Sequence, residues 1–210
     1  RSGWTPASLG FDGAPPRARH HRQTPPMGLV GRSGRLGSVM RIVAVVAVAV
    51  CFMASCGSDP LDRCFEEVDG ALDCSYQDFH GVDLSGRNLR NIDLSYANLF
   101  EANLEGADLI RADLYKANLS RADMDRANLA EANLRGADIS GVSLRWANLT
   151  GADLSEANLN GSYLYESNLK GAHLRSAYIM GTNLYKTTAN KDTTWPDWLN
   201  PEAAGVIFED

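Results

Sequence analysis

The sequence predicts an all-β solenoid, in which the chain winds into stacked coils around an apolar interior. Three observations lead to this prediction. A large hydrophobic residue returns every five positions, a small residue stands two positions before it, and the pattern runs without a gap over residues 77–186 of the 210-residue chain.

The five-residue repeat is most regular from Leu84 to Leu184. All 21 positions at this spacing are large aliphatic residues or Met, and Phe79 and Cys74 extend the register backwards. The residue two positions earlier is Ala in 14 of the 21 repeats, and the residue between is Asn or Asp in 17 of the 21. Each repeat therefore reads Ala, Asn or Asp, Leu, followed by two variable residues.

This period excludes the two standard elements. On an α-helix a step of five residues rotates by about 500°, which would spread the leucines over every face. On a flat strand an odd step would send successive leucines to opposite sides of a sheet. A short Ala–Asn–Leu strand alternates in, out, in, and the two variable residues then turn a corner. A chain that turns in the same sense at each repeat winds into a coil with Leu and Ala inside.

With this pattern the chain resembles the pentapeptide-repeat family, whose fold is a right-handed quadrilateral β-helix with four repeats per coil. The resemblance implies that residues 77–186 form about five to six coils, since 110 residues are divided by 20. Asn and Asp suit the corners because their short side chains can bond nearby backbone groups. We therefore interpret the Asn/Asp positions as structural and not as catalytic residues or calcium ligands.

Both ends of the predicted coil stack need caps, because a stack of coils exposes unpaired backbone edges. We expect residues 56–76 to be a tether and N-terminal cap and residues 187–210 to be a C-terminal cap. The latter resembles the closing segment of many pentapeptide-repeat proteins, with Trp195 and Trp198 lying over the last coil. Asn200, Pro201 and Gly205 predict one helical turn there. Arg87 occupies an inward position, which requires an open end where its guanidinium escapes.

The N-terminal part has the composition of a targeting segment. Residues 1–55 contain seven Arg and one Asp, whereas residues 56–210 contain 13 Lys or Arg and 25 Asp or Glu. The apolar run from Ile42 to Ala54 is shorter than the roughly 20 residues that span a bilayer. A basic start, a short apolar run and small residues before a cleavage point are typical of a secretory signal.

We therefore predict a lipoprotein-type signal peptide over residues 40–55. Its last three residues and the one that follows, Met53-Ala54-Ser55-Cys56, resemble a bacterial lipobox, although Met53 stands where Leu is usual. Cys56 would carry the lipid and attach the protein to the bacterial cell membrane or envelope. The alternative is a membrane-anchored or fortuitous apolar run. Residues 1–39 are interpreted as a non-native or disordered extension, and Met27 or Met40 as the true start.

The remaining two cysteines, Cys64 and Cys74, are predicted to form a disulfide outside the cytoplasm. Two reduced thiols are the alternative. A zinc site is disfavoured because no further Cys and no suitably placed His completes four ligands.

No catalytic motif is found. The chain has no nucleophile elbow, no phosphate-binding glycine motif and no HExxH sequence. We therefore expect no enzyme, no cofactor and no metal, and interpret His173 as a surface residue.

One surface offers a candidate binding patch. Residues 20 apart lie above one another in a four-repeat coil, so that Arg145, Tyr165 and Tyr185 share a column, with Trp146 and Tyr163 beside it. Exposed aromatic residues next to Arg suit a protein or glycan partner. The alternative is cross-coil stacking of the rings, or their cover by the C-terminal tail.

Two functions remain for comparison. The first is a lipid-anchored envelope protein that offers a rigid binding or scaffolding surface. The second is a cytoplasmic, DNA-mimicking topoisomerase (gyrase) protection protein, as some relatives are. Mimicry of DNA needs a strong negative field, but residues 77–186 hold 14 acidic and 11 basic residues. We expect no nucleic-acid partner, and a monomer, since the tail has no room for the long C-terminal dimerisation helix of some relatives.

Overall fold

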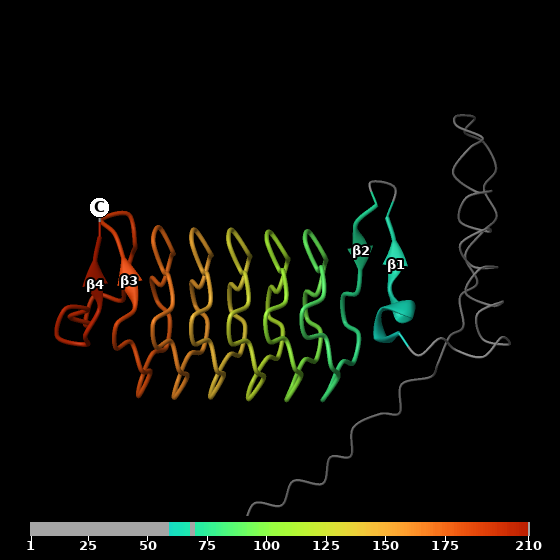
Figure 1. Cartoon of the computed structure of the whole chain (residues 1–210), viewed down its shortest axis with the longest axis horizontal. Coiled ribbons are helices and arrows are strands. Elements are labelled where there is room, and N and C mark those ends of the chain that lie inside the picture. Colours follow the sequence, from blue (N-terminus) through green and yellow to red (C-terminus); the bar gives the residue numbers. More distant parts are fainter. Residues whose placement is uncertain (1–58, 68–69, 210) are drawn as a thin grey trace, which may run out of the picture. The chain divides into compact units, whose positions relative to one another are not determined.

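The computed structural model describes residues 59–67 and 70–209. The segments predicted as extension and signal peptide, together with Cys56, lie outside these residues. The assigned elements are the 3-10 helix η1 (Pro60–Arg63) and the strands β1 (Phe65–Glu66), β2 (Leu72–Asp73), β3 (Thr188–Ala189) and β4 (Ile207–Phe208). Between β2 and β3 the chain forms a row of stacked coils (Figure 1). No helix among the described residues is long and apolar enough to cross a membrane.

The coils are joined by parallel bridges between residues 20 positions apart. The first pairs Asp73 with Asp93, and the same step continues to the pair of Asn168 and Thr188. Only the last bridge, between His173 and Thr194, has a step of 21 residues. One coil therefore contains four five-residue repeats, and the predicted all-β solenoid is confirmed.

The interior is the predicted ladder of leucines and alanines. Every large residue at the five-residue spacing from Leu84 to Leu184 is buried, with at most 4% of its surface exposed. The alanines from Ala97 to Ala177 are buried as well. Burial of one Leu side chain contributes about 2 kcal/mol before the loss of chain entropy is subtracted. One continuous core thus runs along the whole stack.

The Asn and Asp residues of the repeat hold the start of each corner. Each bridges to the residue 20 positions away in a neighbouring coil, and its Oδ1 accepts a hydrogen bond from the backbone N–H two positions later, as Asp93 does from Ser95 at 2.8 Å. Some of these side chains also bond along the stack, since Asn118 donates to Asn98 at 3.1 Å. The geometry accounts for the Asn/Asp preference by backbone bonding alone.

The second variable residue of each repeat has a left-handed backbone conformation. Every fifth residue from Tyr76 to Lys186 has a φ between 53° and 70°, whether or not it is Gly. The turn is closed by a bond across it, for example from the Ser162 N–H to the Leu159 carbonyl at 3.0 Å. This is the sign pattern of a type II turn, which favours Gly at that position.

Gly161 offers a clean measurement of this backbone preference. Its φ is 68°, and a Cβ placed on it would meet nothing within 4 Å. We expect Gly161→Ala to lower the free energy of unfolding by about 1 kcal/mol, because the penalty is conformational and not steric. Urea unfolding of both proteins measures the change. Ser176→Gly, the reverse change at an equivalent position (φ 61°), should raise the stability; a loss in both variants would contradict the explanation.

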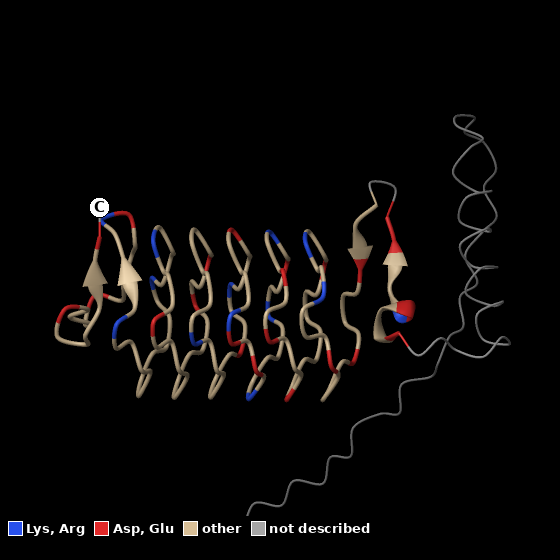
Figure 2. Cartoon of the chain, in the orientation of Figure 1, with Lys and Arg blue, Asp and Glu red and all other residues tan. Residues whose placement is uncertain are grey.

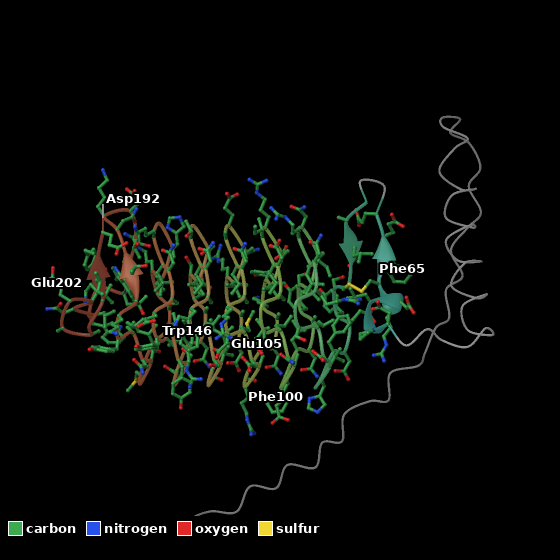
Figure 3. All side chains as sticks on the ribbon, viewed as in Figure 1. Phe65, Phe100, Glu105, Trp146, Asp192 and Glu202 are labelled. Carbon is green, nitrogen blue, oxygen red and sulfur yellow. A yellow bond between two sulfur atoms is a disulfide. The ribbon has the colours of Figure 1, made fainter. Side chains whose placement is uncertain are left out.

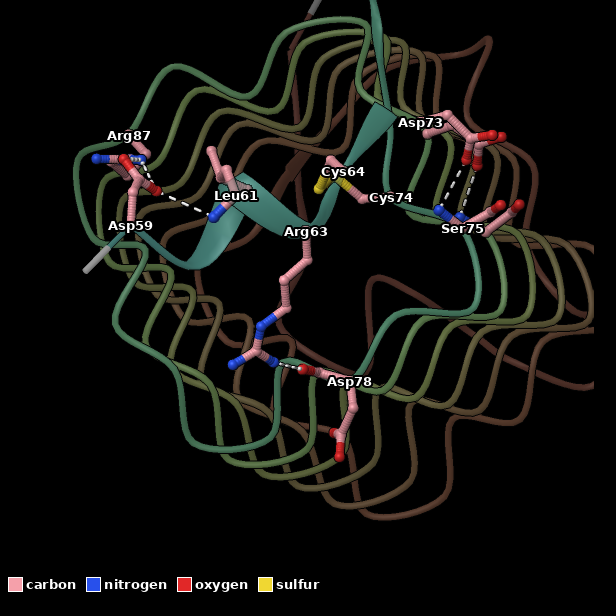
Figure 4. The surroundings of a disulfide bond; sticks show 11 residues. Asp59, Leu61, Arg63, Cys64, Asp73, Cys74, Ser75, Asp78 and Arg87 are labelled. Atoms are coloured by element: carbon pink, nitrogen blue, oxygen red, sulfur yellow. Dashed lines mark hydrogen bonds and ion pairs between the residues drawn. A yellow bond between two sulfur atoms is a disulfide. The ribbon is translucent and has the colours of Figure 1, made fainter. Parts of the chain in front are cut away.

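The N-terminal cap lies over the first coil and is tied to it by a disulfide. Cys64, just after η1, is bonded to Cys74, the first buried residue of the ladder (Figure 4). Strands β1 and β2 pair antiparallel between the two cysteines. Leu61 packs against the core at the N-terminal end of the stack, and Arg63 donates to the Asp78 carbonyl at 3.0 Å.

Arg87 leaves the interior at this open end, as expected. Its guanidinium forms an ion pair with Asp59, and both side chains are 40% exposed (Figure 4). Asp59 also caps η1 by accepting from the Leu61 N–H at 3.0 Å. The hydrogen bond from Arg87 is the main reason why the pKa of the Asp59 carboxyl lies below its ordinary value.

The C-terminal tail first continues the stack, with Thr194 bridged to His173, and then returns to pair with β3. β4 lies parallel to β3, and the Lys186 N–H bonds to the Gly205 carbonyl at 2.9 Å. Trp195 packs against the core, whereas Trp198 is 63% exposed, so only the first of the two predicted covering residues is placed against the interior. Asn200 caps the expected turn by accepting from the Ala203 N–H at 3.1 Å, and residues 201–205 form hydrogen-bonded turns in place of a helix.

Candidate functional site: an aromatic column on the coil surface

The candidate patch is built from rings that lie one above another on successive coils. The Trp146 ring meets the edge of Tyr165 at a centroid distance of 6.2 Å, and Tyr165 stacks on Tyr185 at 6.1 Å with an interplanar angle of 26°. The 20-residue coil produces this contact because it places the same corner of each coil at the same position along the stack. Figure 3 shows Trp146 towards the C-terminal end, further along the stack than Glu105.

Three side chains of the neighbouring column pack on these rings. The Arg126 guanidinium lies 5.1 Å from the Trp146 ring, and the Lys186 ammonium lies 5.5 Å from the Tyr165 ring. Glu166 links Trp146 to Lys186, since its carboxylate accepts from Trp146 Nε1 at 2.9 Å and from Lys186 Nζ at 3.2 Å. Each ring of this group therefore has a charged or aromatic partner.

Arg145 and Tyr163 form the second part of the patch. The Arg145 guanidinium lies 5.3 Å from the Tyr163 ring and 3.6 Å from the Asp125 carboxylate. Asp125 also accepts from the Arg145 backbone N–H at 2.9 Å. The five predicted residues are thus close together, in two groups that are joined through the chain at Arg145 and Trp146.

The two interpretations of the patch both find support in the geometry. The rings stack across the coils, as the structural interpretation expects. The tail covers them only in part: Gly205 lies beside the Tyr185 ring, but Trp146, Tyr163 and Tyr185 remain 45%, 45% and 57% exposed. The stacking holds the rings in fixed positions and leaves much of their surface available to a partner.

Hydrogen-bond donors around Glu166 shift the pKa of its carboxyl group. The Tyr165 hydroxyl, the Trp146 N–H and the Lys186 ammonium all stabilise the carboxylate of Glu166 and so lower its pKa. The pKa of Lys186 is raised, first by Glu166 and then by Tyr165.

The lowered pKa of Glu166 predicts a dependence of stability on pH. A carboxyl whose pKa is lower in the folded protein contributes stability above its unfolded pKa, about 4.5, and this stability is lost as the pH falls through the folded value. We expect Glu166→Gln to be less stable than the wild type at neutral pH and to approach it below about pH 4. Urea unfolding at several pH values measures both. Glu202→Gln, on the tail, is the control; a Glu166→Gln difference that is independent of pH would contradict the prediction.

Sequence reasoning missed the charged members of the site, Arg126, Glu166 and Lys186. The signal was present in the sequence. Arg126, Trp146, Glu166 and Lys186 follow one another at steps of 20 residues, so they occupy the same variable position of successive coils. It also missed a second aromatic group near the N-terminal cap, where Tyr76 stacks on Tyr96 at 4.8 Å and Tyr96 meets the edge of Tyr115 at 5.4 Å.

Metal-ligating side chains do not gather in the part of the chain that the structure describes. No group of three or more His, Cys, Asp or Glu residues there is arranged to hold a metal ion. The predicted lipidation residue, Cys56, lies outside the described residues, so the structure does not test it.

Comparison with known proteins identifies the repeat. The family model described as pentapeptide repeats matches in eight copies, over residues 78–114, 107–145 and 147–184. Among solved structures, the pentapeptide repeat protein Rfr23 from the cyanobacterium Cyanothece 51142 is 31% identical, with a TM-score of 0.53, over 54% of this chain and 90% of that chain.

Two further solved structures are similar to parts of the chain. A pentapeptide repeat protein from the Arabidopsis thaliana thylakoid lumen is 27% identical over 59% of this chain and 71% of that chain, with a TM-score of 0.37. The plasmid-mediated fluoroquinolone resistance protein QnrB1 is 17% identical over 67% of this chain and 88% of that chain, with a TM-score of 0.40. No curated protein matches the chain.

Proposed function

The chain belongs to the pentapeptide-repeat family, and on this premise we propose that it is a non-enzymatic, lipid-anchored protein of the bacterial cell envelope. Its rigid coil stack, which we take to be the right-handed quadrilateral β-helix of about five to six coils, serves as a binding or scaffolding surface. The ladder of bridges 20 residues apart supports this form, since 20 residues make four repeats.

The observation that carries the binding role is the exposed aromatic column. Trp146, Tyr165 and Tyr185 are held in place by ring contacts and by Glu166 and Lys186, yet the two outer rings are about half exposed. Rigid aromatic side chains lose little conformational freedom when a partner binds, which is why they dominate the energy of many interfaces. The partner is a protein or a glycan of the envelope.

The envelope location is supported by the disulfide between Cys64 and Cys74. Disulfides persist in oxidising compartments and are rare in the cytosol. The lipid on Cys56 is proposed from the sequence pattern, and it would attach the protein next to its N-terminal cap, because Asp59 is already part of that cap.

The intact mass of the protein, purified from membranes of its native host, tests the location. We expect a mature chain that begins at lipid-modified Cys56 and is two hydrogens lighter because Cys64 and Cys74 are bonded. When lipoprotein signal peptidase is inhibited, the unprocessed precursor should accumulate instead. An unprocessed, unlipidated chain in the cytosol would rule the proposal out.

Crosslinking tests the binding role separately. A photo-crosslinking amino acid at Tyr185 should yield a defined adduct in intact cells, and Trp146→Ala should weaken it. The same amino acid at Ala130, on another corner, is the control. Equal labelling from both positions would mean that the column is not the binding surface.

The charge distribution argues against gyrase protection, the alternative function. Figure 2 shows Lys and Arg interspersed with Asp and Glu along the coils, and cations such as Arg111, Arg121 and Arg135 are paired with Glu residues about one coil away. A DNA-like field needs uncompensated negative charge. We expect a fluoroquinolone to inhibit DNA supercoiling by gyrase to the same extent with and without the protein.

A further inference from the structure

The backbone of the last coil contains an open sheet edge. On a fully paired face, three hydrogen bonds connect one coil to the next. At residues 157–161 these run from Leu159 N to the Tyr178 carbonyl (2.7 Å), from Gly161 N to the Met180 carbonyl (2.9 Å) and from Tyr178 N to the Ala157 carbonyl (2.9 Å). Most faces of the stack repeat this pattern.

One coil later the same three groups have no partner. Within residues 59–67 and 70–209, the N–H groups of Ile179 and Gly181 find no acceptor, and the Ala177 carbonyl finds no donor. The cause is the path of the chain. The last bridge is formed by Thr194, and the tail pairs with the stack again only at Lys186 and β3. The face at residues 177–181 thus lacks its next strand.

A groove lies beside this open edge. Two adjoining clefts, of about 300 and 340 Å³, follow residues 175–180 on the coil, and both are bordered by Trp198. Pro196 lines one cleft and Met180 the other. The groove therefore runs parallel to the backbone groups that have no partner.

The side chains that border the groove are large, apolar and unusually exposed. Tyr178, Met180 and Trp198 are 63%, 74% and 63% exposed. In contrast to Trp146 and Tyr165, the rings of Tyr178 and Trp198 contact no other ring and no cation in the described part of the chain. Apolar surface of this kind is a feature of binding sites and not of a soluble cap.

We propose that this face binds an extended peptide strand of a partner protein, which takes the position of the missing strand. The partner's backbone bonds to Ile179 N, Gly181 N and the Ala177 carbonyl. Residues 178–180 bond in the same way to the equivalent groups of residues 157–161 in the preceding coil. A β-branched or aromatic side chain of the peptide packs between Tyr178 and Trp198. Strand addition of this type takes its affinity from the backbone bonds and its specificity from the side-chain pockets.

The chemistry of the edge selects a peptide over a glycan or a lipid. Two N–H donors and one C=O acceptor at the spacing of a β-ladder match the groups of an extended backbone. The site lies apart from the aromatic column and does not depend on lipidation, so the inference goes beyond the proposed function and can fail independently of it.

Peptide selection on the full-length chain tests the proposal. A displayed library of random ten-residue peptides is selected on the immobilised protein, with the Trp198→Ala protein as the counter-selection. We expect enriched peptides with alternating apolar residues. The best of these is synthesised, and its affinity is measured by fluorescence anisotropy. We expect Trp198→Ala and Met180→Ala to weaken binding about tenfold each. Tyr76→Ala removes an exposed ring near the N-terminal cap and should leave the affinity within about twofold.

Backbone pairing is distinguished from simple apolar contact by two measurements. N-methylation of the peptide amides that face the edge should weaken binding at least about tenfold, since it removes hydrogen bonds and keeps the side chains. In the free protein, the Gly181 amide should exchange with solvent faster than the equivalent Gly161 amide. The bound peptide should slow exchange at Gly181 and leave exchange at Gly161 unchanged.

Three outcomes would overturn the inference. The first is a library without any peptide that prefers the wild type to Trp198→Ala. The second is binding that N-methylation does not change. The third is self-association, seen by analytical ultracentrifugation, that protects Gly181 without any peptide, because a second copy would then occupy the edge.

Discussion

Replacing Leu129 with alanine is expected to lower the free energy of unfolding by about 3 to 5 kcal/mol. Leu129 has no exposed surface and lies in the middle of the ladder, between Met124 and Leu134, which are also buried. The alanine leaves a cavity that its neighbours cannot fill, because the backbone on every side is held by bonds to the coils above and below. The loss thus contains both the transfer of the removed atoms and the cost of the cavity.

Urea unfolding followed by circular dichroism measures this change. Met124→Leu is the matched control, since it keeps an apolar side chain of similar volume in the same ladder and should change the stability by less than about 1.5 kcal/mol. A cost below about 1 kcal/mol for Leu129→Ala would mean that the interior relaxes around the cavity and is not the rigid ladder described above.

The second large effect is expected from the disulfide. Replacing both Cys64 and Cys74 with alanine should lower the free energy of unfolding by about 3 kcal/mol, the loop-entropy value for a short closed loop. The two residues are 10 positions apart and join the cap to the first buried rung of the core. The effect should be concentrated at the N-terminal end, because each coil of a solenoid contacts only its neighbours.

Unfolding with and without a reducing agent separates this effect from that of the substitutions. The reduced wild type should match the double variant, and the double variant should not respond to the reducing agent. Amide exchange provides the location: Phe79, whose N–H bonds to the second coil, should exchange faster in the variant, whereas Leu159 should not change. Equal acceleration at both positions would contradict a local effect.

The sequence by itself determined which side chains face inward. The five-residue period places Leu and Ala inside and the Asn or Asp between them outside, and the burial of Leu84 to Leu184 follows this pattern without exception. A strictly local repeat is enough for this purpose, because each five-residue unit has the same short strand and the same corner. Arg87 was recognisable as an exception for the same reason, as a charge at an inward position.

The five-residue pattern did not determine how many repeats form one coil. A period of five predicts corners, but how many corners close a coil is decided by the backbone bonds between coils. The family resemblance implied four, and the bridges between residues 20 apart show it. Once this number is known, the contacts of Trp146 with Tyr165 and Glu166 follow from the sequence, whereas without it they do not.

The ends of the stack were decided by the tertiary structure alone. Asp59 as the partner of Arg87, Trp195 packed inside with Trp198 outside, and the unpaired edge at residues 177–181 all depend on the path of segments without a repeat. Such segments are placed by packing and by the backbone groups that the last coils leave open. No local period records these contacts, because each joins residues that only the folded chain brings together.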